Sequence, residues 1–347
     1  MKYFLFTVIL FLSLESAAQL PVSDFRVIWY NVENCFDTID DPEKNDDEFL
    51  PSGNRYWTPK RYYHKLRQIA RVITAAGEWD APALIGLCEV ENDTVLTHLT
   101  TRTPLKNQHY RYCITKGSDP RGINIAVLYR RDKFAPVGEE SIPLRFEKGK
   151  ATRDILHVWG RVITGDTLDV FACHFPSRSG GERETERFRK SACLTLRHLC
   201  DSLYAVRRLP NILIMGDFND MPDDRNIREH LGAEPLVSSS EETQLVNLFA
   251  DPKRLKLSGS HKYQGEWHQL DQIIVSRNLL RPSNPLQVQP ESIALFAPSF
   301  LLTEDKTWRG KRPKRTHYGF RYEGGYSDHL PLLVRLVFPS LLSPSEL

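Results

Sequence analysis

The sequence predicts an α/β protein in which two packed sheets are covered by helices. Short apolar runs rich in β-branched and aromatic residues recur along the chain, and Asn, Asp and Gly turns separate them. Only two long segments have apolar residues at the three- and four-residue spacing of a core-facing helix. Each sheet and each helix must bury an apolar face against another element. Many strands with few helices therefore favour two sheets packed together, with helices outside.

The expected elements form one domain over residues 24–340, because no repeat or low-complexity linker divides the chain. The expected strands are 25–30, 83–88, 110–115, 123–129, 155–163, 168–174, 212–215, 269–275 and 332–338. The first helix should begin after Thr58, which can cap it, with Pro59 in its first position, and should end at Gly77. The second helix is expected over residues 184–206.

The first 18 residues have the pattern of a secretory signal peptide. Lys2 precedes the apolar run 4–12, and the small residues 16–18 follow that run. The run is shorter than the roughly 20 apolar residues that span a bilayer. We therefore expect a periplasmic or secreted protein with no stable membrane anchor. An uncleaved amphipathic N-terminus is the alternative.

Charge and cysteine content set further limits. A formal net charge of +2 gives no whole-protein basic field, so any affinity for a polyanion must come from local patches. Export would permit disulfides among the six cysteines. However, Cys88 and Cys173 lie inside apolar runs, and Cys193 and Cys200 lie on the second expected helix. We therefore expect mostly reduced, buried thiols, with one or two disulfides as the alternative.

Acidic, amide and imidazole side chains stand at the ends of six apolar strands. They are Asn31 with Glu33, Glu89, His174, Asp217 with Asn219, Asp271, and Asp328 with His329. An unpaired carboxylate beside a core strand costs several kcal/mol, and a single one is usually a cap or a turn former. Six at the same kind of boundary indicate a shared hard cation or an acid–imidazole network. Oxygen ligands suit Mg²⁺, Mn²⁺ or Ca²⁺ better than zinc, which leaves the imidazoles free for proton transfer.

The segments that carry these residues resemble the ordered motifs of the endonuclease/exonuclease/phosphatase superfamily. The segments are 29–34, 87–90, 174–178, 216–219, 270–273 and 327–329. Each motif is short, but all six occur in the family's order and cover nearly the whole mature chain. The resemblance implies a four-layered α/β sandwich with its site at one edge of two mainly antiparallel sheets.

The resemblance also implies a metal site. Asn31 and Glu89 would hold the ion, with Asp328 nearby as a further ligand. Glu33 stands where many relatives carry an acidic residue, so it is a weaker candidate. The expected ion is Mg²⁺ or Mn²⁺, with Ca²⁺ as another option.

Five further residues receive catalytic roles from the same resemblance. Asp217 would orient or deprotonate the attacking water, and Asn219 would hold a phosphate oxygen. Asp271 would hydrogen-bond His329 and favour its charged form. His174 would stabilise the developing charge or protonate the leaving oxygen.

Several basic groups could contact substrate phosphate, because guanidinium groups match phosphate oxygens. Arg178, shortly after His174, is the best placed, whereas Arg121 and Arg153 could equally be surface or strand-edge charges. The basic run 306–315 is either a polyanion-binding loop or a solvated face. His261 is interpreted as a polar loop residue rather than a catalytic one.

The sequence therefore predicts an exported, divalent-metal-dependent phosphodiesterase, with a nuclease acting on DNA or RNA as the leading hypothesis. The same core acting on a lipid or inositol phosphate is the alternative. A secreted binding module without catalysis is a third class, but a binder has no need of two imidazoles and an aligned carboxylate. The expected partner is the phosphate-ester substrate. No protein partner is indicated, and we expect a monomer.

Overall fold

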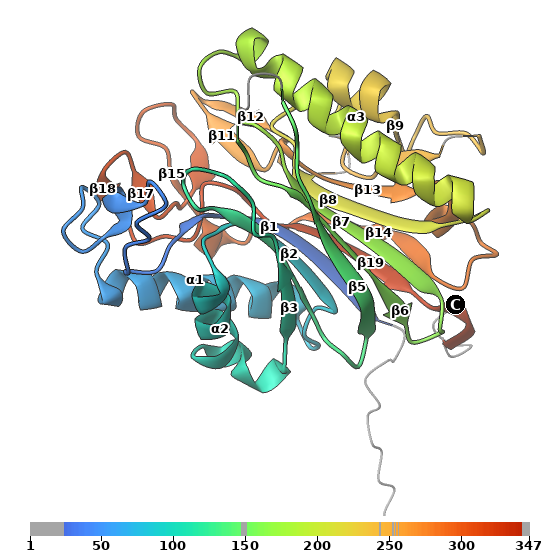
Figure 1. The fold of residues 1–347 in the computed structure, drawn as a ribbon, viewed down its shortest axis with the longest axis horizontal. Helices are drawn as coiled ribbons and strands as arrows, with labels where there is room; N and C mark the ends of the chain where they lie inside the picture. The colour runs from blue at the N-terminus through green and yellow to red at the C-terminus, as the bar shows by residue number, and fades with distance from the viewer. Residues whose placement is uncertain are drawn as a thin grey trace, which may run out of the picture.

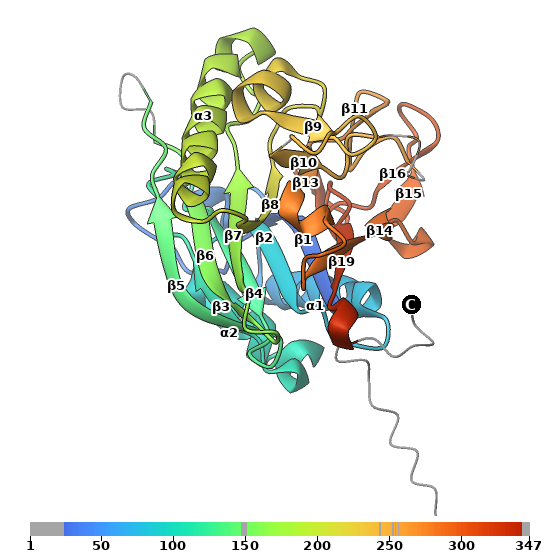
Figure 2. The same ribbon diagram turned by 90° about the vertical axis from the view of Figure 1, so that its right-hand side faces the viewer.

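Two sheets pack face to face with helices on their outer surfaces (Figure 1). The computed structural model describes residues 24–341 apart from 147–150, 243, 252, 254 and 256. Figures 1 and 2 show α1 and α2 outside one sheet and α3 outside the other. This arrangement confirms the predicted α/β sandwich of four layers. The predicted signal peptide, residues 1–18, lies outside the described residues.

The six-stranded sheet carries both ends of the described chain. Its strands in spatial order are β14 (Gln287–Leu295), β19 (Leu332–Val337), β1 (Phe25–Cys35), β2 (Leu84–Val90), β4 (Asn124–Tyr129) and β3 (Arg111–Ile114). Only β1 and β2 pair in parallel within this sheet. Both therefore bring their C-terminal ends, with Asn31 and Glu89, to the same edge of the sheet.

The seven-stranded sheet brings three polar residues to its own edge. Its strands in spatial order are β5 (Phe134–Ile142), β6 (Ile155–Val162), β7 (Thr167–His174), β8 (Asn211–Asp217), β13 (Asp271–Ser276), β10 (Leu245–Asn247) and β9 (Ala233–Pro235). Strands β7 and β8 pair in parallel, as do β9 and β10, and the other pairs are antiparallel. In this register Asp217 is the partner of both His174 and Asp271. The three side chains therefore form a row across β7, β8 and β13.

The two long predicted helices are confirmed. Helix α1 (Pro59–Gly77) begins where Thr58 Oγ1 accepts a hydrogen bond from the Arg61 backbone N–H, and α3 covers Glu182–Val206. Helix α2 (Asp93–Thr101) was not predicted, because its nine residues are too few for a clear periodicity. Strands β5 and β14 were also missed, since β5 is mostly exposed and a proline interrupts β14.

Short elements complete the described chain. The hairpins are β11 (His261–Tyr263) with β12 (Glu266–His268), β15 (Leu302–Glu304) with β16 (Lys311–Pro313), and β17 (His317–Tyr318) with β18 (Arg321–Tyr322). The single helical turns are Asp47–Phe49, Pro104–Gln108, Asn226–Leu231, Arg277–Leu280, Ser299–Leu301 and Pro339–Leu341.

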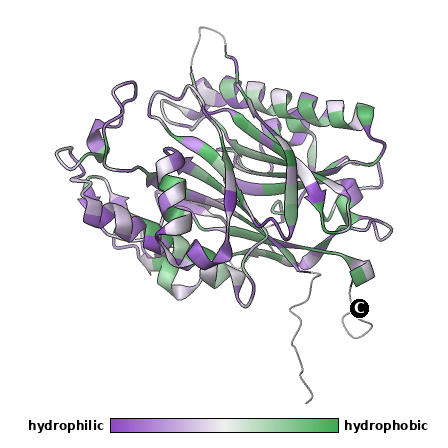
Figure 3. Ribbon diagram, turned by 60° about the horizontal axis from the view of Figure 1, so that its bottom comes forward, coloured by the Kyte–Doolittle hydropathy of each residue, from purple (hydrophilic) through white to green (hydrophobic). Residues whose placement is uncertain are grey.

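The alternation of side chains along β7 and β8 divides the apolar interior in two. Alternate residues of these strands face the other sheet, namely Val170, Ala172, Leu213 and Met215. The intervening residues pack under α3, namely Phe171, Cys173, Ile212 and Ile214. Figure 3 shows apolar residues along the central strands and polar residues on the outer loops. Both faces of these strands are thus buried, which explains their continuously apolar sequences.

Close packing between the sheets depends on Gly86. A Cβ atom at Gly86 would lie 2.6 Å from Trp29 Cε3 and 2.7 Å from Met215 Sδ. The absence of a side chain lets the fully buried Trp29 indole lie between the two sheets. The indole N–H of Trp29 donates to Asp271, at the start of β13, at 2.8 Å.

All six cysteines are free and buried, which confirms the prediction of reduced thiols. None of the helices in the described part of the chain is both long and apolar enough to cross a membrane.

Candidate active site

His329 and Asp271 form a hydrogen-bonded acid–imidazole pair at the rim. His329 Nδ1 lies 2.6 Å from Asp271 Oδ2, and His329 Nε2 lies 3.8 Å from Asp217 Oδ2. The Trp29 indole N–H (2.8 Å) and the Ser260 hydroxyl (2.5 Å) also donate to the fully buried Asp271 carboxylate. Burial by itself lowers the pKa of His329, but the Asp271 and Asp217 carboxylates raise it well above 6.5. His329 is therefore an imidazolium at neutral pH, fixed by Asp271 in one orientation.

His174 has the opposite electrostatic environment. Its Nε2 lies 3.7 Å from Asp217 Oδ2 and 3.9 Å from Glu89 Oε1. Its buried Nδ1 has no hydrogen-bond partner among the described residues. Burial, followed by the positive charges of Arg153 and Arg121, lowers the pKa of His174 well below 6.5. This imidazole is neutral at physiological pH.

Asn31, Glu89 and Asp217 converge from the two sheets. Asn31 Nδ2 lies 3.2 Å from Glu89 Oε1 and 3.0 Å from Asp217 Oδ2, and the Asn34 backbone N–H donates to Glu89 Oε2. Burial and then the Asp271 charge raise the pKa of Asp217 to about 7. A hard divalent cation fits this donor set, because carboxylate and amide oxygens are its preferred ligands. The Asn31 amide nitrogen faces the two carboxylates, while its Oδ1 accepts the Glu33 backbone N–H at 3.0 Å, so a ligand role for this oxygen requires the amide to turn and give up that bond.

Asp328 and Glu33 bind an arginine and backbone groups. Arg315 Nη2 donates to Asp328 Oδ2 at 2.6 Å, and Arg315 Nε lies 3.5 Å from Glu33 Oε1. Glu33 also accepts the backbone N–H groups of Thr316 (2.6 Å) and His317 (3.2 Å). The Glu33 carboxylate thus holds the segment that carries Arg315. A ligand role for Asp328 stays a prediction.

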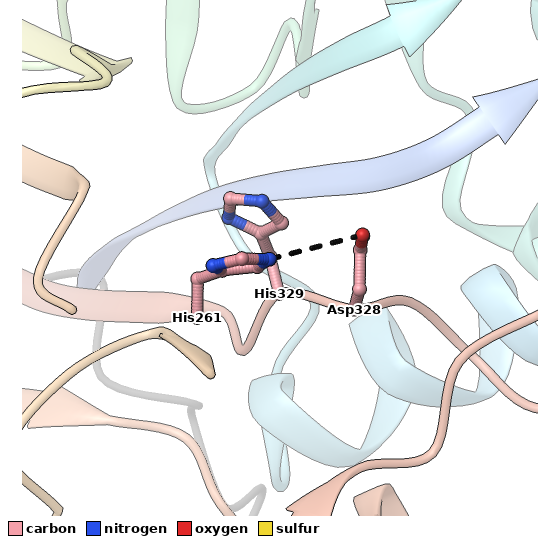
Figure 4. Close-up of side chains that lie close together, drawn as sticks. All are labelled: His261, Asp328 and His329. Carbon is pink, nitrogen blue, oxygen red and sulfur yellow. Dashed lines mark ion pairs between the residues drawn. The ribbon is translucent and has the colours of Figure 1, made fainter. Parts of the chain in front are cut away.

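His261 lies directly against the His329–Asp271 pair, although its sequence context indicated only a polar loop residue. Its ring centroid is 4.6 Å from that of His329, and its Nε2 lies 4.0 Å from Asp328 Oδ2 (Figure 4). A backbone bridge between His261 and His329 brings the β11–β12 hairpin onto the site. In the described part of the chain, two groups of side chains have potential metal-ligand atoms within 4.8 Å of one another. One group is Asp217, Asp271 and His329, and the other is His261, Asp328 and His329.

Asn219 is fixed beside Asp217 in a left-handed backbone conformation with φ of 51°. Its backbone N–H donates to Asp217 Oδ1 at 3.0 Å, and its side-chain amide donates to the Phe175 carbonyl at 3.1 Å. Arg178 Nε donates to the Asn219 carbonyl at 2.7 Å. Asn219, which the sequence placed in the site, therefore lies there.

Comparison with known proteins agrees with this geometry. The model of the endonuclease/exonuclease/phosphatase family matches residues 26–337. The chain belongs to this family. Members of the family are metal-dependent phosphoesterases, and the oxygen-rich site described above fits that chemistry. The comparison with curated protein sequences gave no match.

Three solved structures illustrate the shared fold. A mannosyl-6-phosphatase from Bacteroides thetaiotaomicron has a TM-score of 0.55 and 16% identity, covering 90% of this chain and 100% of its own. The human Nocturnin catalytic domain with bound sulfate has a TM-score of 0.55 and 16% identity, and the match covers 92% of this chain and 95% of that domain. D. rerio TDP2 in complex with a single-strand DNA product has a TM-score of 0.55 and 14% identity, and the match covers 90% of this chain and 99% of that one. At these identities the likeness shows the fold alone.

In this family member a cleft of about 700 Å³ opens beside the acid–imidazole pair. Asn219 and His261 lie at the end of the cleft that is nearest the pair, and the β11–β12 hairpin forms one wall. Its charged lining residues include Arg178, Glu182 and Glu266. The cleft is therefore lined by charges of both signs.

The predicted substrate arginines differ in their placement. Arg178 lines the cleft, but its Nη1 and Nη2 donate to Glu182 (2.7 Å) and Asp224 (2.6 Å). Arg121 is half-exposed and pairs with Asp119 at 3.2 Å. Arg153 is buried and donates to Asp119 and to the Phe175 carbonyl. Substrate contact by any of them stays a prediction.

A basic turn, comprising Lys306, Arg309 and Lys311, lies beside the same hairpin. All three side chains are exposed. Lys262 of β11 joins the hairpin to this turn by donating to the Arg309 carbonyl at 2.8 Å. A Cβ at Gly265 would lie 3.3 Å from Trp308 Cβ, so the two segments are in close contact. Cationic groups therefore continue outward from the wall of the cleft.

Proposed function

We propose that this chain is an exported phosphodiesterase that hydrolyses the backbone of DNA or RNA by internal cleavage. The observation that carries this proposal is the position of the basic turn. Lys262 joins this turn to the β11–β12 hairpin, and His261 of the same hairpin bridges to His329 of the His329–Asp271 pair. A strand with its scissile phosphate at His329 could place neighbouring phosphates along these cations. The signal-peptide pattern of residues 1–18 supports action in the periplasm or outside the cell.

Asn31 and Glu89 would hold the divalent ion, expected to be Mg²⁺ or Mn²⁺ with Ca²⁺ as another option. The ion would neutralise charge on the scissile phosphate when bound. Asp217 is placed to orient the attacking water and accept its proton, because burial and Asp271 raise its pKa to about 7. The Asn219 amide and Arg178 are the candidate contacts to phosphate oxygens.

The two imidazoles have separate roles in this mechanism. The His329 imidazolium stabilises the charge that develops on phosphorus-bound oxygens, and it can supply the proton that the leaving oxygen needs. Asp271 keeps His329 charged and oriented. The neutral His174 donates one hydrogen bond to the developing charge, which is a weaker form of assistance.

A second candidate substrate follows from the mixed charge of the cleft. Glu182 and Glu266 would disfavour a second phosphate there, whereas a neutral polar group such as a sugar would fit. The mannosyl-6-phosphatase from Bacteroides thetaiotaomicron, which shares the fold, gives this option a precedent. Lipid and inositol phosphates remain the further alternatives. A binding module without catalysis is disfavoured by the supported pair His329–Asp271.

The test compares the purified chain with its His329→Ala variant on several esters. The substrates are plasmid DNA, RNA, bis(p-nitrophenyl) phosphate, sphingomyelin, an inositol phosphate and mannose 6-phosphate, each with Mg²⁺, Mn²⁺ or EDTA. Metal-dependent conversion of supercoiled plasmid to nicked and linear forms, lost in the variant, is the expected result. Hydrolysis confined to the small or lipid esters would overturn the nuclease proposal while keeping the catalytic site.

A further inference from the structure

Two pairs of carboxylates in the site differ in how their charge is balanced. Glu89 and Asp217 face an amide and a neutral imidazole. Glu33 and Asp328 instead share the guanidinium of Arg315. In the first pair only Asp217 has a cationic neighbour, the His329 imidazolium at 3.8 Å, whereas in the second pair Arg315 donates directly to Asp328 at 2.6 Å.

The backbone places Arg315 with little freedom. The Gly325 N–H donates to the Arg315 carbonyl at 3.1 Å. A Cβ at Gly325 would lie 2.5 Å from that carbonyl oxygen and 2.0 Å from that of Lys314, so only glycine permits this approach. On the other side, the buried Lys65 ammonium donates to Thr316 Oγ1 at 2.5 Å. Arg315 is thus built into the site and is only 30% exposed.

Charge and geometry both suit a permanent cation at this position. The Arg315 guanidinium offers donors to two carboxylates at once, which a hydrated lysine does less well. The Lys65 ammonium adds a second positive charge that acts on Glu33. Arg315 and Lys65 thus place positive charge beside Glu33 and Asp328 without an added ion.

We propose that Arg315 occupies the cation position at Asp328, so that this phosphoesterase binds a single divalent ion at Asn31 and Glu89. Asp328 then serves as the anchor of Arg315 rather than as a metal ligand. Arg315 is a positioning residue: it holds the Asp328 carboxylate in place, and that carboxylate in turn lies 4.0 Å from His261 Nε2. The inference rests on the metal dependence within the proposed function, but its test requires no substrate.

The first measurement is Mn²⁺ binding to the full chain by equilibrium dialysis and by titration calorimetry. One ion per chain is expected for the wild type. Glu89→Gln should abolish binding or weaken it by at least 100-fold, whereas Asp328→Asn should change the dissociation constant by less than about threefold. Two ions in the wild type, or a tenfold or larger loss in Asp328→Asn, would overturn the proposal. Because binding is measured directly, an inactive or differently specific enzyme leaves this result intact.

Arg315→Gln tests the arginine itself, with Arg309→Gln as a matched control on the exposed basic turn. Removing Arg315 should expose the Asp328 carboxylate and allow a second, weaker Mn²⁺ to bind. Arg309→Gln should still bind one ion. Melting curves in EDTA confirm that each variant is folded. A folded Arg315→Gln protein that still binds only one ion, at unchanged affinity, would show that Arg315 does not hold a cation position.

Discussion

The two sheets supply different chemistry to one rim. The six-stranded sheet contributes oxygen donors, Asn31 and Glu89, at the ends of its parallel pair β1 and β2. The seven-stranded sheet contributes the row His174, Asp217 and Asp271, which is suited to moving or holding protons. The site therefore depends on how the sheets are held against each other, as well as on each sheet separately.

The same contrast separates the two imidazoles. His329 precedes β19 of one sheet but hydrogen-bonds Asp271 of the other, and this contact raises its pKa. His174 lies near carboxylates of both sheets without a hydrogen bond to either, and burial, followed by the charges of Arg153 and Arg121, lowers its pKa. The histidine that is hydrogen-bonded to a buried carboxylate is charged, and the one without such a bond is neutral. Sequence position alone would have given them similar roles.

The largest expected effect is the loss of His329. His329→Ala should lower kcat on bis(p-nitrophenyl) phosphate by about 100- to 1000-fold, as is typical when one group that stabilises transition-state charge is removed. His174→Ala, which removes a neutral donor, should cost only about tenfold. Steady-state kinetics in saturating Mg²⁺ measures both. Equal losses for the two variants would contradict the division of roles between charged and neutral imidazole.

The next effect concerns pH and isolates the support that Asp271 gives. The imidazolium form is required, and its proton is lost as pH rises through the raised pKa of His329, so activity should persist through neutral pH and fall on the alkaline side. Asp271→Asn removes the main charge that raises this pKa. The alkaline fall of kcat/KM should therefore begin at a lower pH in Asp271→Asn. An unchanged alkaline limb would mean that another group limits the rate there.

Local signals predicted most of the fold and the candidate residues, but not how those residues are supported. Helix α1 was predicted because Thr58 and Pro59 mark its start, and the strand-end residues converge because strand ends share a rim. Trp29 was expected only as a strand residue, yet it donates to Asp271, 242 positions away. Arg315 appeared as part of a basic run, yet it contacts Glu33 across 282 positions. Such contacts depend on tertiary packing, which no local spacing encodes.

A smaller effect on activity is expected from the contact between the two sheets, in which Trp29 of β1 donates to Asp271 of β13. Trp29→Phe keeps most of the ring but leaves a buried oxygen of Asp271 without its indole donor, at a cost of about 1–3 kcal/mol in unfolding free energy. Trp57→Phe is the matched control, since the buried Trp57 indole donates to the Phe36 carbonyl. Urea unfolding should show similar losses for both variants. Only Trp29→Phe should also lower kcat, and equal activities would show that the indole is structural only.

The smallest effect concerns the basic turn, and it separates binding from chemistry. Changing Lys306, Arg309 and Lys311 together to Gln should leave kcat on bis(p-nitrophenyl) phosphate unchanged, because that small diester cannot reach across the hairpin. Binding to DNA should weaken, and the slope of log K against log salt should become shallower by about 0.7 to 0.9 for each phosphate that the variant no longer neutralises. Fluorescence anisotropy with a labelled oligonucleotide between about 50 and 200 mM salt measures that slope. An unchanged slope would assign the turn to a solvated surface and shift the substrate toward a phosphate ester of a neutral polar group, such as a sugar phosphate.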